Sequence, residues 1–207
     1  MKFLEYFPQA VFQTFADRQD VNGAAKIFEK YDKGLFQNLN NAGHGIYFTP
    51  NGFKGGRKKG NLVKLNAVYA DLDIAKEGEG MAIEERERRK KSLEGELIRW
   101  YPPNFCIYTK NGLQPIWLID EGGTDAEAQE KYTKVINGII EWSKKKGAKG
   151  DKVKDVTRVL RLPGFYHMKS EPFLVTAGQA HEHRAMLDEM LEAFPVEEQR
   201  PEASYVQ

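Results

Sequence analysis

Cysteine is nearly absent from this sequence: among 207 residues there is one, Cys106. A single thiol excludes an internal disulfide and any zinc site built from several cysteines. Long apolar runs are absent as well, since none reaches the roughly 18–20 residues that a membrane span needs. The N-terminal stretch MKFLEYFPQA also lacks the apolar core of a signal peptide. We therefore expect a soluble, cytoplasmic protein with no membrane partner.

An excess of charge of one sign is lacking too, because 31 Lys and Arg face 30 Asp and Glu and the sequence pI is about 7.8. Domains that bind duplex DNA without help from another domain usually have a pI above about 9. A nucleic-acid partner would therefore be held by local basic segments or by another domain. Three such segments occur, each of which is also typical of an ordinary solvated surface: KGGRKKG (54–60), RERRKK (86–91) and SKKKGAKGDKVK (143–154).

Internal repeats and low-complexity linkers are missing, and the length and the hydrophobic content of 41% suit one domain with a buried core. We expect that domain over residues 1–195 and a flexible tail over 196–207. Short runs rich in aromatic and β-branched residues predict strands at 10–15, 45–49, 65–73, 105–109, 114–119, 158–162 and 172–176. Apolar residues at helical spacing predict helices at 22–36, 81–100, 124–147 and 181–195.

Strands and helices are thus intermixed, which indicates an α+β fold. One tight hairpin is expected at Asn111-Gly112, because this pair is preferred in type I′ turns. For the helix over 124–147, Thr124 is the expected N-cap and Glu127 completes a capping box.

Two aspartates close the strand expected in NAVYADLDIAK (66–76). Because side chains alternate along a strand, Asp71 and Asp73 project from the same face, about 7 Å apart. Like charges at that distance raise a pKa unless a cation lies between them. Hard divalent ions such as Mg²⁺ prefer carboxylate and phosphate oxygens. The pair is therefore a candidate metal site, although two solvated aspartates at a strand end would look the same.

A third acid could come from GDKVKDVTRVLRLPGFYHMK (150–169), which offers Asp151 and Asp155. Asp155 leads directly into the strand expected at 158–162 and has the same parity as Arg161. Guanidinium groups bind phosphate in a forked geometry, so this face suits a site for metal and triphosphate. An ordinary surface ladder of ion pairs remains the alternative.

Three segments together resemble the motifs of the archaeo-eukaryotic primase (AEP, or prim-pol) superfamily. YADLD (69–73) is similar to its hydrophobic-Asp-hydrophobic-Asp motif, and YTKNGLQPIWLI (108–119) to its second motif. DVTRVLRLPGFYHMK (155–169) resembles the third motif, in which an acid precedes an R-L-P-G turn and a lysine. FQTFAD and GHGIYFTPNGF resemble segments that precede the first motif in phage and plasmid members. The match runs in order over about residues 10–170.

This resemblance implies an RRM-like antiparallel or mixed sheet packed with helices, an N-terminal α/β subdomain, and an active-site cleft between them. It implies a DNA primase or DNA polymerase that uses two Mg²⁺ or Mn²⁺ ions. Carried over by position, Asp71, Asp73 and Asp155 would be catalytic and bind the metal ions. The residues expected to bind the nucleotide are Lys110, Asn111, Gln114, Arg161, His167 and Lys169.

The implied partners are a single-stranded DNA template with its primer, an NTP or dNTP, and a helicase domain or protein in the full-length replication protein. A phage- or plasmid-encoded member would work in the host cytoplasm. The sequence departs from the family at Gln114, where histidine is common. Glutamine can donate to a phosphate oxygen, but it carries no charge and cannot shuttle a proton.

Two other functions stay open. A metal-dependent nuclease could use the same three aspartates to activate water, but it has less need of Arg161 and Lys169 than a triphosphate-binding enzyme has. A catalytically silent nucleic-acid-binding module is the non-enzymatic alternative, and it would be favoured by a missing acid. HEH (181–183) has the spacing of a rolling-circle initiator's metal pair, but its central residue, Glu182, is not hydrophobic.

Overall fold

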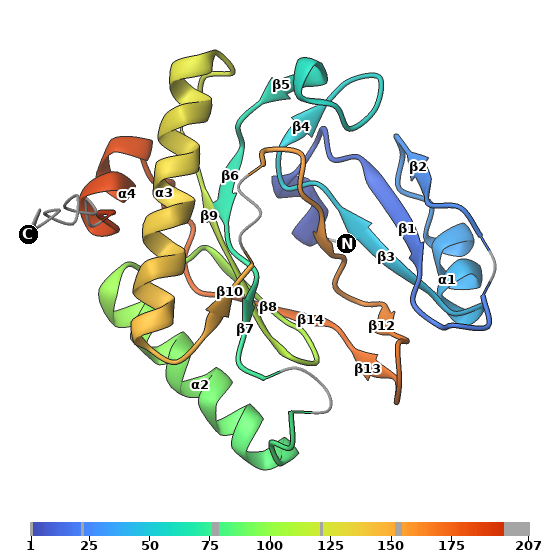
Figure 1. Ribbon diagram of the computed structural model, residues 1–207. Helices are drawn as coiled ribbons and strands as arrows, with labels where there is room; N and C mark the ends of the chain where they lie inside the picture. The colour runs from blue at the N-terminus through green and yellow to red at the C-terminus, as the bar shows by residue number, and fades with distance from the viewer. Residues whose placement is uncertain (1, 22, 76–78, 121, 152–154, 197–207) are drawn as a thin grey trace, which may run out of the picture.

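Two antiparallel sheets lie side by side in the computed structural model, which describes residues 2–21, 23–75, 79–120, 122–151 and 155–196 (Figure 1). Helices α2, α3 and α4 lie on one side of the larger sheet, and α1 lies beyond the smaller one. The helices are α1 (Lys33–Asn41), α2 (Ile83–Trp100), α3 (Ala126–Lys145) and α4 (Leu187–Ala193), with 3₁₀ turns at Lys2–Tyr6 and Lys59–Asn61.

The larger sheet has six strands in the order β10-β7-β9-β8-β14, and β6 also pairs with β9. Its central strand is β9, which is buried along its whole length and pairs with β8, β7 and β6. The strands are β6 (Ala67–Tyr69), β7 (Leu72–Asp73), β8 (Phe105–Tyr108), β9 (Gly112–Leu118), β10 (Lys149–Gly150) and β14 (Thr176–Gln179).

The smaller sheet has the order β11-β3-β1-β2, and every pair in it is antiparallel. Its strands are β1 (Phe12–Ala16), β2 (Lys26–Phe28), β3 (His44–Phe48) and β11 (Leu160–Arg161). Strand β11 comes from the RVLRLPG segment, so the third primase-like motif completes the sheet of the N-terminal subdomain. Two short hairpins pair β4 (Gly52–Phe53) with β5 (Leu62–Lys64) and β12 (Tyr166–His167) with β13 (Phe173–Leu174).

One continuous core lies under the helices and between the sheets. Trp117 of β9 is fully buried against Phe194, with ring centroids 5.7 Å apart, and its indole N–H donates to the carbonyl of Tyr101. In α3, the buried residues recur at helical spacing, as the amphipathic pattern requires: Tyr132, Val135, Ile136 and Ile139. Burial of these aromatic and aliphatic side chains supplies the main driving force for folding.

Several expected elements are wrong in detail. The helix expected at 22–36 is instead strand β2 followed by α1, because Asp32 caps that helix by accepting a hydrogen bond from the N–H of Leu35. The N-cap of α3 is Asp125, whose carboxylate accepts from the N–H of Ala128, and not Thr124. Helix α4 begins only at Leu187, so HEH lies in a loop.

The hairpin between β8 and β9 turns at Lys110-Asn111, one residue earlier than expected. Thr109 N–H donates to the carbonyl of Gly112, which is already the first residue of β9 and has no positive φ. This glycine is required for space: a Cβ at Gly112 would lie 1.8 Å from the carbonyl oxygen of Leu72 in the neighbouring strand. Gly112 is therefore needed because β7 and β9 approach closely there, and the Asn111-Gly112 pair does not form a type I′ turn.

The α+β class, with an antiparallel sheet packed with helices and an N-terminal α/β subdomain, is confirmed. The tail expected over 196–207 lies outside the described residues except for Val196. Among the helices that the structure describes, none combines the length and the apolar character that crossing a bilayer requires.

Candidate active site

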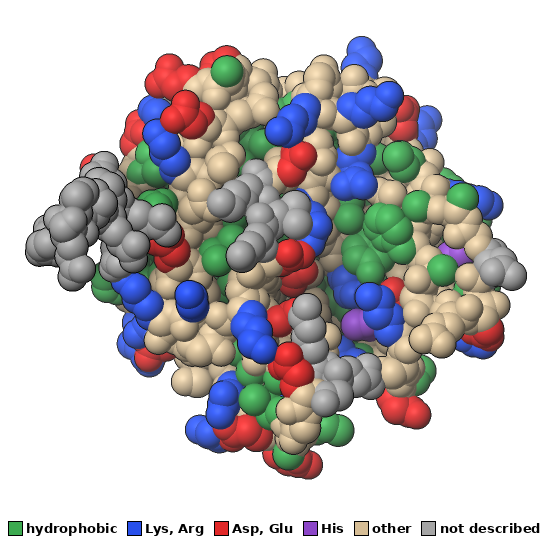
Figure 2. Space-filling model, in the orientation of Figure 1, with side chains coloured by type: hydrophobic (Ala, Val, Ile, Leu, Met, Phe, Trp, Pro, Cys, Tyr) green, Lys and Arg blue, Asp and Glu red, His purple; other side chains and the backbone are tan. Residues whose placement is uncertain are grey.

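A cavity of about 350 Å³ lies where the two sheets face each other. Figure 2 shows acidic and basic side chains meeting along this line, beside a hydrophobic patch over the four-stranded sheet. Residues from both sheets and from the connecting loops line the cavity: Phe15, Tyr47, Arg57, Asp71, Asp73, Thr109, Asn111, Gln114, Arg158, Val159, Arg161, His167 and Lys169.

Asp71 and Asp73 form the acidic wall. The register pairs Tyr69 with Ile116 and Leu72 with Leu113, so Asp71 lies opposite Gln114 on the cavity face, and Asp73 lies opposite Gly112. The shared face expected from strand parity is therefore confirmed. Burial, followed by the charge of Asp73, raises the pKa of Asp71 to about 6. A cation bound beside the pair would relieve both effects.

Gln114 connects the acidic wall to the opposite sheet. It is 4% exposed, its Oε1 accepts from the backbone N–H of Arg161 at 3.2 Å, and its side chain favours the charged form of Asp71, which lies opposite it in the sheet. Gln114 thus lies between the acidic wall and β11. The expectation that Gln114 contacts the nucleotide stays a prediction.

The basic wall comes from the third motif and contains Arg161, His167 and Lys169. His167 is 7% exposed, and neither ring nitrogen has a hydrogen-bond partner in the part of the chain that the structure describes. Burial, followed by the charge of Arg161, lowers the pKa of His167 to about 4. At neutral pH this side chain is an uncharged imidazole with one donor and one acceptor still to be satisfied.

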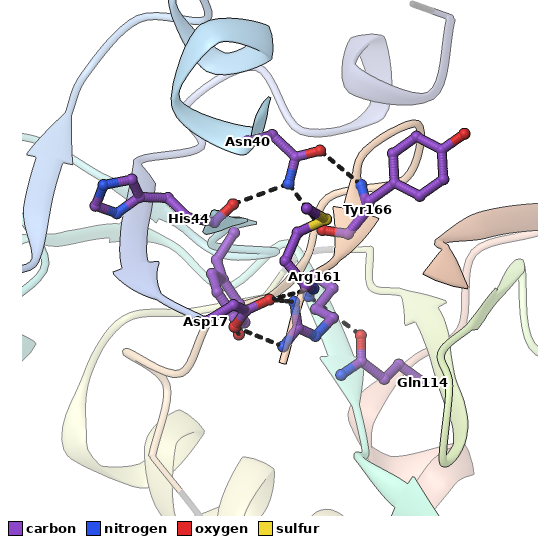
Figure 3. Close-up of polar contacts among 8 residues, drawn as sticks. Asp17, Asn40, His44, Gln114, Arg161 and Tyr166 are labelled. Carbon is purple, nitrogen blue, oxygen red and sulfur yellow. Dashed lines mark hydrogen bonds and ion pairs between the residues drawn. The ribbon is translucent and has the colours of Figure 1, made fainter. Parts of the chain in front are cut away.

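Arg161 is held by Asp17, a residue to which sequence reasoning gave no role (Figure 3). Its two Nη atoms donate to the two carboxylate oxygens of Asp17 at 2.8 and 3.0 Å, and the guanidinium carbon lies 4.8 Å from the ring centroid of Tyr47. Asp17 and Arg161 are 144 positions apart. A local pattern could not have revealed this pair.

Asp155, the expected third acid, is not among the described residues that line the cavity. Its carboxylate accepts from the backbone N–H of Thr157 at 2.9 Å and so caps the turn before β11. Asp151 does not line the cavity either, but it contacts the acidic pair: its backbone N–H donates to the carbonyl of Asp71 at 3.0 Å, and its charge raises the pKa of Asp71. The Asp151 carboxylate itself pairs with Arg158.

The turn between β8 and β9 borders the cavity through Thr109 and Asn111. Lys110 does not line it; its ammonium donates to Ser170 Oγ and to the carbonyl of Glu171. The buried Lys90 of α2 donates to the carbonyl of Thr109 at 2.6 Å and so fixes the base of the turn.

The basic segment 54–60 forms the loop between β4 and β5, at one end of the cavity. Arg57 turns inward, lines the cavity and donates to the carbonyl of Thr157 at 2.6 Å. Lys54, Lys58 and Lys59 are exposed. The segment thus carries one cavity residue and three cations that face solvent.

Within the described residues, no group of three or more His, Cys, Asp and Glu side chains is placed to enclose a metal ion. Two adjacent carboxylates suit Mg²⁺ nevertheless, because this ion keeps several waters and is commonly bound by one or two carboxylates together with substrate phosphates. The raised pKa of Asp71 supports the fit, since a cation beside the pair would remove the repulsion. The arrangement can therefore hold a polyphosphate between a cation-binding wall and a basic wall.

No family model matches the chain. A curated replication protein from Clostridium perfringens is 28% identical over 159 residues, which cover 73% of this chain and 36% of the relative. The chain therefore spans only about a third of the length of that relative.

Two solved structures have a similar fold. The AEP domain of the primase-polymerase of cyanophage S-2L has a TM-score of 0.66 at 15% identity, over 94% of this chain and 95% of that one. The catalytic domain of primase RepB′, solved in complex with initiator DNA, has a TM-score of 0.59 at 13% identity, over 92% and 88%. The fold that the resemblance implied is thus confirmed: the chain has the fold of the AEP domain of primase-polymerases.

Proposed function

We propose that this chain is the catalytic domain of a DNA primase-polymerase. It transfers nucleotides from an NTP or dNTP to a primer 3′-hydroxyl, or to a first nucleotide, as a DNA template directs. The observation that carries the proposal is the cavity between the two sheets, with Asp71 and Asp73 on one wall and Arg161, His167 and Lys169 on the other. The AEP-type fold supports the same assignment.

Asp71 and Asp73 would hold two divalent ions, Mg²⁺ or Mn²⁺, together with phosphate oxygens of the nucleotide. When bound, such ions lower the pKa of an attacking hydroxyl and offset the charge of the leaving pyrophosphate. The amide of Gln114, which lies opposite Asp71 and favours its charged form, would keep that carboxylate pointing into the cavity.

The basic wall binds the triphosphate. Arg161 and Lys169 supply positive charge, and guanidinium groups match phosphate geometry closely. His167 supplies a neutral hydrogen-bond donor, because its pKa of about 4 keeps it uncharged at neutral pH. Asn111, in the turn between β8 and β9, adds an uncharged polar side chain to the cavity.

Asp151 is a better candidate than Asp155 for a third carboxylate. The hydrogen bond from its backbone to the Asp71 carbonyl supports this choice, whereas the Asp155 carboxylate caps a turn. Metal binding would compete with Arg158 for the Asp151 carboxylate, which is 46% exposed and therefore held only weakly.

The template is single-stranded DNA, held in part by the exposed lysines of the 54–60 loop at one end of the cavity. Phosphate contacts from flexible lysines give affinity without sequence preference. The complex of primase RepB′ with initiator DNA supports a DNA partner for this fold. A helicase domain or protein would open the duplex for a replication enzyme of this type.

Primer extension tests the proposal. A labelled primer on a DNA template is incubated with the chain, Mg²⁺ or Mn²⁺, and each class of nucleotide in turn. We expect incorporation by the parent chain, a loss of at least about 100-fold in an Asp71→Asn, Asp73→Asn variant that stays folded, and no change in Asp20→Asn, an exposed control. Incorporation that survives the double change would overturn the assignment. Cleavage of the labelled strand without nucleotides would identify a nuclease instead.

A further inference from the structure

The carboxylate of Asp17 is almost completely shielded from solvent beside the basic wall. Asp17 directly follows β1, and its side chain is 1% exposed, while that of its partner Arg161 is 8% exposed. Two hydrogen bonds join them, from Nη1 to Oδ2 at 2.8 Å and from Nη2 to Oδ1 at 3.0 Å (Figure 3). This fork of parallel bonds fixes the plane of the guanidinium as well as its position.

The same carboxylate holds a second part of the basic wall. Asp17 Oδ2 also accepts from the backbone N–H of Met168 at 3.0 Å. Met168 lies between His167 and Lys169, the two other residues of the basic wall. One side chain thus sets the position of Arg161 and of the segment that carries both neighbours.

A neighbouring contact ties this segment to the N-terminal subdomain at one more point. Asn40, which is 1% exposed, donates to the carbonyl of Tyr166 and accepts from its N–H, both at 2.8 Å. Asn40 also donates to the carbonyl of His44 at the start of β3. Hydrogen bonds from the N-terminal subdomain therefore hold the backbone on both sides of His167, at Tyr166 and at Met168.

We propose that Asp17 is a positioning residue for the incoming nucleotide: it orients Arg161 and the 167–169 segment so that together they bind the triphosphate. This inference rests on the proposed function. Asp17 takes two of the five guanidinium N–H donors, so three are left for an anion. Asp17 does not itself line the cavity, so it acts on the nucleotide through these neighbours.

The energetics favour a positioning role over a stabilising one. A buried ion pair gains little net stability, because desolvation of two charges offsets much of their attraction. Burial opposes the charge on Asp17, but the hydrogen bonds and charge of Arg161 outweigh it and hold the pKa of Asp17 below its ordinary value. The carboxylate therefore stays ionised and paired with Arg161 throughout the neutral pH range.

The expected effect is on nucleotide affinity and not on the chemical step. Because a misplaced Arg161 weakens contacts that are present before and during the reaction, KM changes and kcat does not. We expect Asp17→Asn to raise the KM for the nucleotide about tenfold in primer extension, with kcat within about threefold of the parent. Asp20→Asn, which removes a nearby exposed carboxylate paired with Arg18, should change neither.

A double-mutant cycle separates positioning from general damage to the fold. In an Arg161→Met background, addition of Asp17→Asn should change the KM less than twofold, because the carboxylate acts through the guanidinium. This double variant leaves no unpaired buried charge, so it remains informative if Asp17→Asn alone does not fold.

Three outcomes would contradict the inference. An unchanged KM in folded Asp17→Asn, a parallel loss in kcat, or additive effects in the cycle would each overturn it while the parent chain still extends primers. A parent chain that incorporates no nucleotide would instead overturn the proposed function, and this inference with it.

Discussion

The backbone N–H of Asp151 donates a hydrogen bond to the carbonyl oxygen of Asp71 at 3.0 Å. This contact continues the pairing of β10 with β7, in which Gly150 lies opposite Leu72. It brings an acid from the GDKVKD segment beside the two aspartates of YADLD, although 80 residues separate them in the chain. The side-chain parity that pointed to Asp155 carries no such information, because it does not specify which strands are neighbours.

The two acids of this segment should respond differently to truncation. We expect Asp151→Ala to reduce nucleotide incorporation at least about 100-fold with little effect on stability, because its ion pair with Arg158 is solvent-exposed. Asp155→Ala should keep activity within about threefold but lower the free energy of unfolding by about 1 kcal/mol, because Thr157 N–H loses its acceptor. Primer extension and urea unfolding measure the two effects. The reverse pattern would restore Asp155 as the third carboxylate.

The metal-free protein should be destabilised by the charge on Asp71. Its folded pKa of about 6 lies above the ordinary value of 3.8, so the folded state binds a proton at Asp71 more tightly than the unfolded state does. The stability that protonated Asp71 contributes is fully present below pH 3.8 and is lost as the pH rises through 6. In EDTA at pH 7.5, Asp71→Asn should therefore be more stable than the parent by about 1–2 kcal/mol, allowing for partial exposure. Near pH 3.5 the two should be equal.

Added divalent ion should counter this destabilisation of the parent. Thermal unfolding at pH 7.5 should show that millimolar Mn²⁺ raises the Tm of the parent and has a smaller effect on Asp71→Asn, because ligand binding stabilises only the state that binds. Equal shifts in both proteins would argue against a metal site at Asp71.

His167 should make the protein sensitive to mild acid. Its folded pKa of about 4 lies below the ordinary value of 6.5, so the neutral ring contributes stability above pH 6.5 that is lost as the pH falls toward 4. Urea unfolding should show a loss of about 2 kcal/mol between pH 7 and pH 5 that is absent in His167→Gln. The same loss in the variant would show that other groups cause it.

Gly112 should tolerate no side chain. Its added Cβ would lie 1.8 Å from the Leu72 carbonyl, so Gly112→Ala must displace β7 and with it Asp73. We expect a loss of at least about 2 kcal/mol of unfolding free energy and reduced incorporation. Gly60→Ala is the matched control, since no atom lies within 4 Å of the added Cβ, and it should change stability by less than about 0.5 kcal/mol.

The loop lysines should contribute salt-dependent affinity for single-stranded DNA. Removal of two phosphate contacts by Lys58→Ala, Lys59→Ala should weaken binding of an oligonucleotide and reduce the slope of log K against log salt by about 1.4. Fluorescence anisotropy over 50–200 mM salt measures both. Lys30→Ala, Lys33→Ala, which removes two exposed lysines near the start of α1, is the control. An unchanged slope in the loop variant would exclude this loop from template binding.

Most of what the sequence predicted correctly depends on short-range patterns. Side chains alternate between the two faces of a strand, so residues two positions apart share a face whatever the strand pairs with. This rule placed Asp71 and Asp73 on one face. Helical spacing located α2 and α3 for the same reason. It failed over 22–36, where pairing of β2 with β1 overrode the local preference.

The sequence by itself determined the α+β class, the shared face of Asp71 and Asp73, and the ordered motifs that resemble primases. The tertiary structure alone decided that Asp17 holds Arg161, that Gln114 joins the two sheets, and that the backbone of Asp151 pairs with that of Asp71. Each of these depends on contacts between residues 47 to 144 positions apart. Their partners are set by sheet order and register, which no local period encodes.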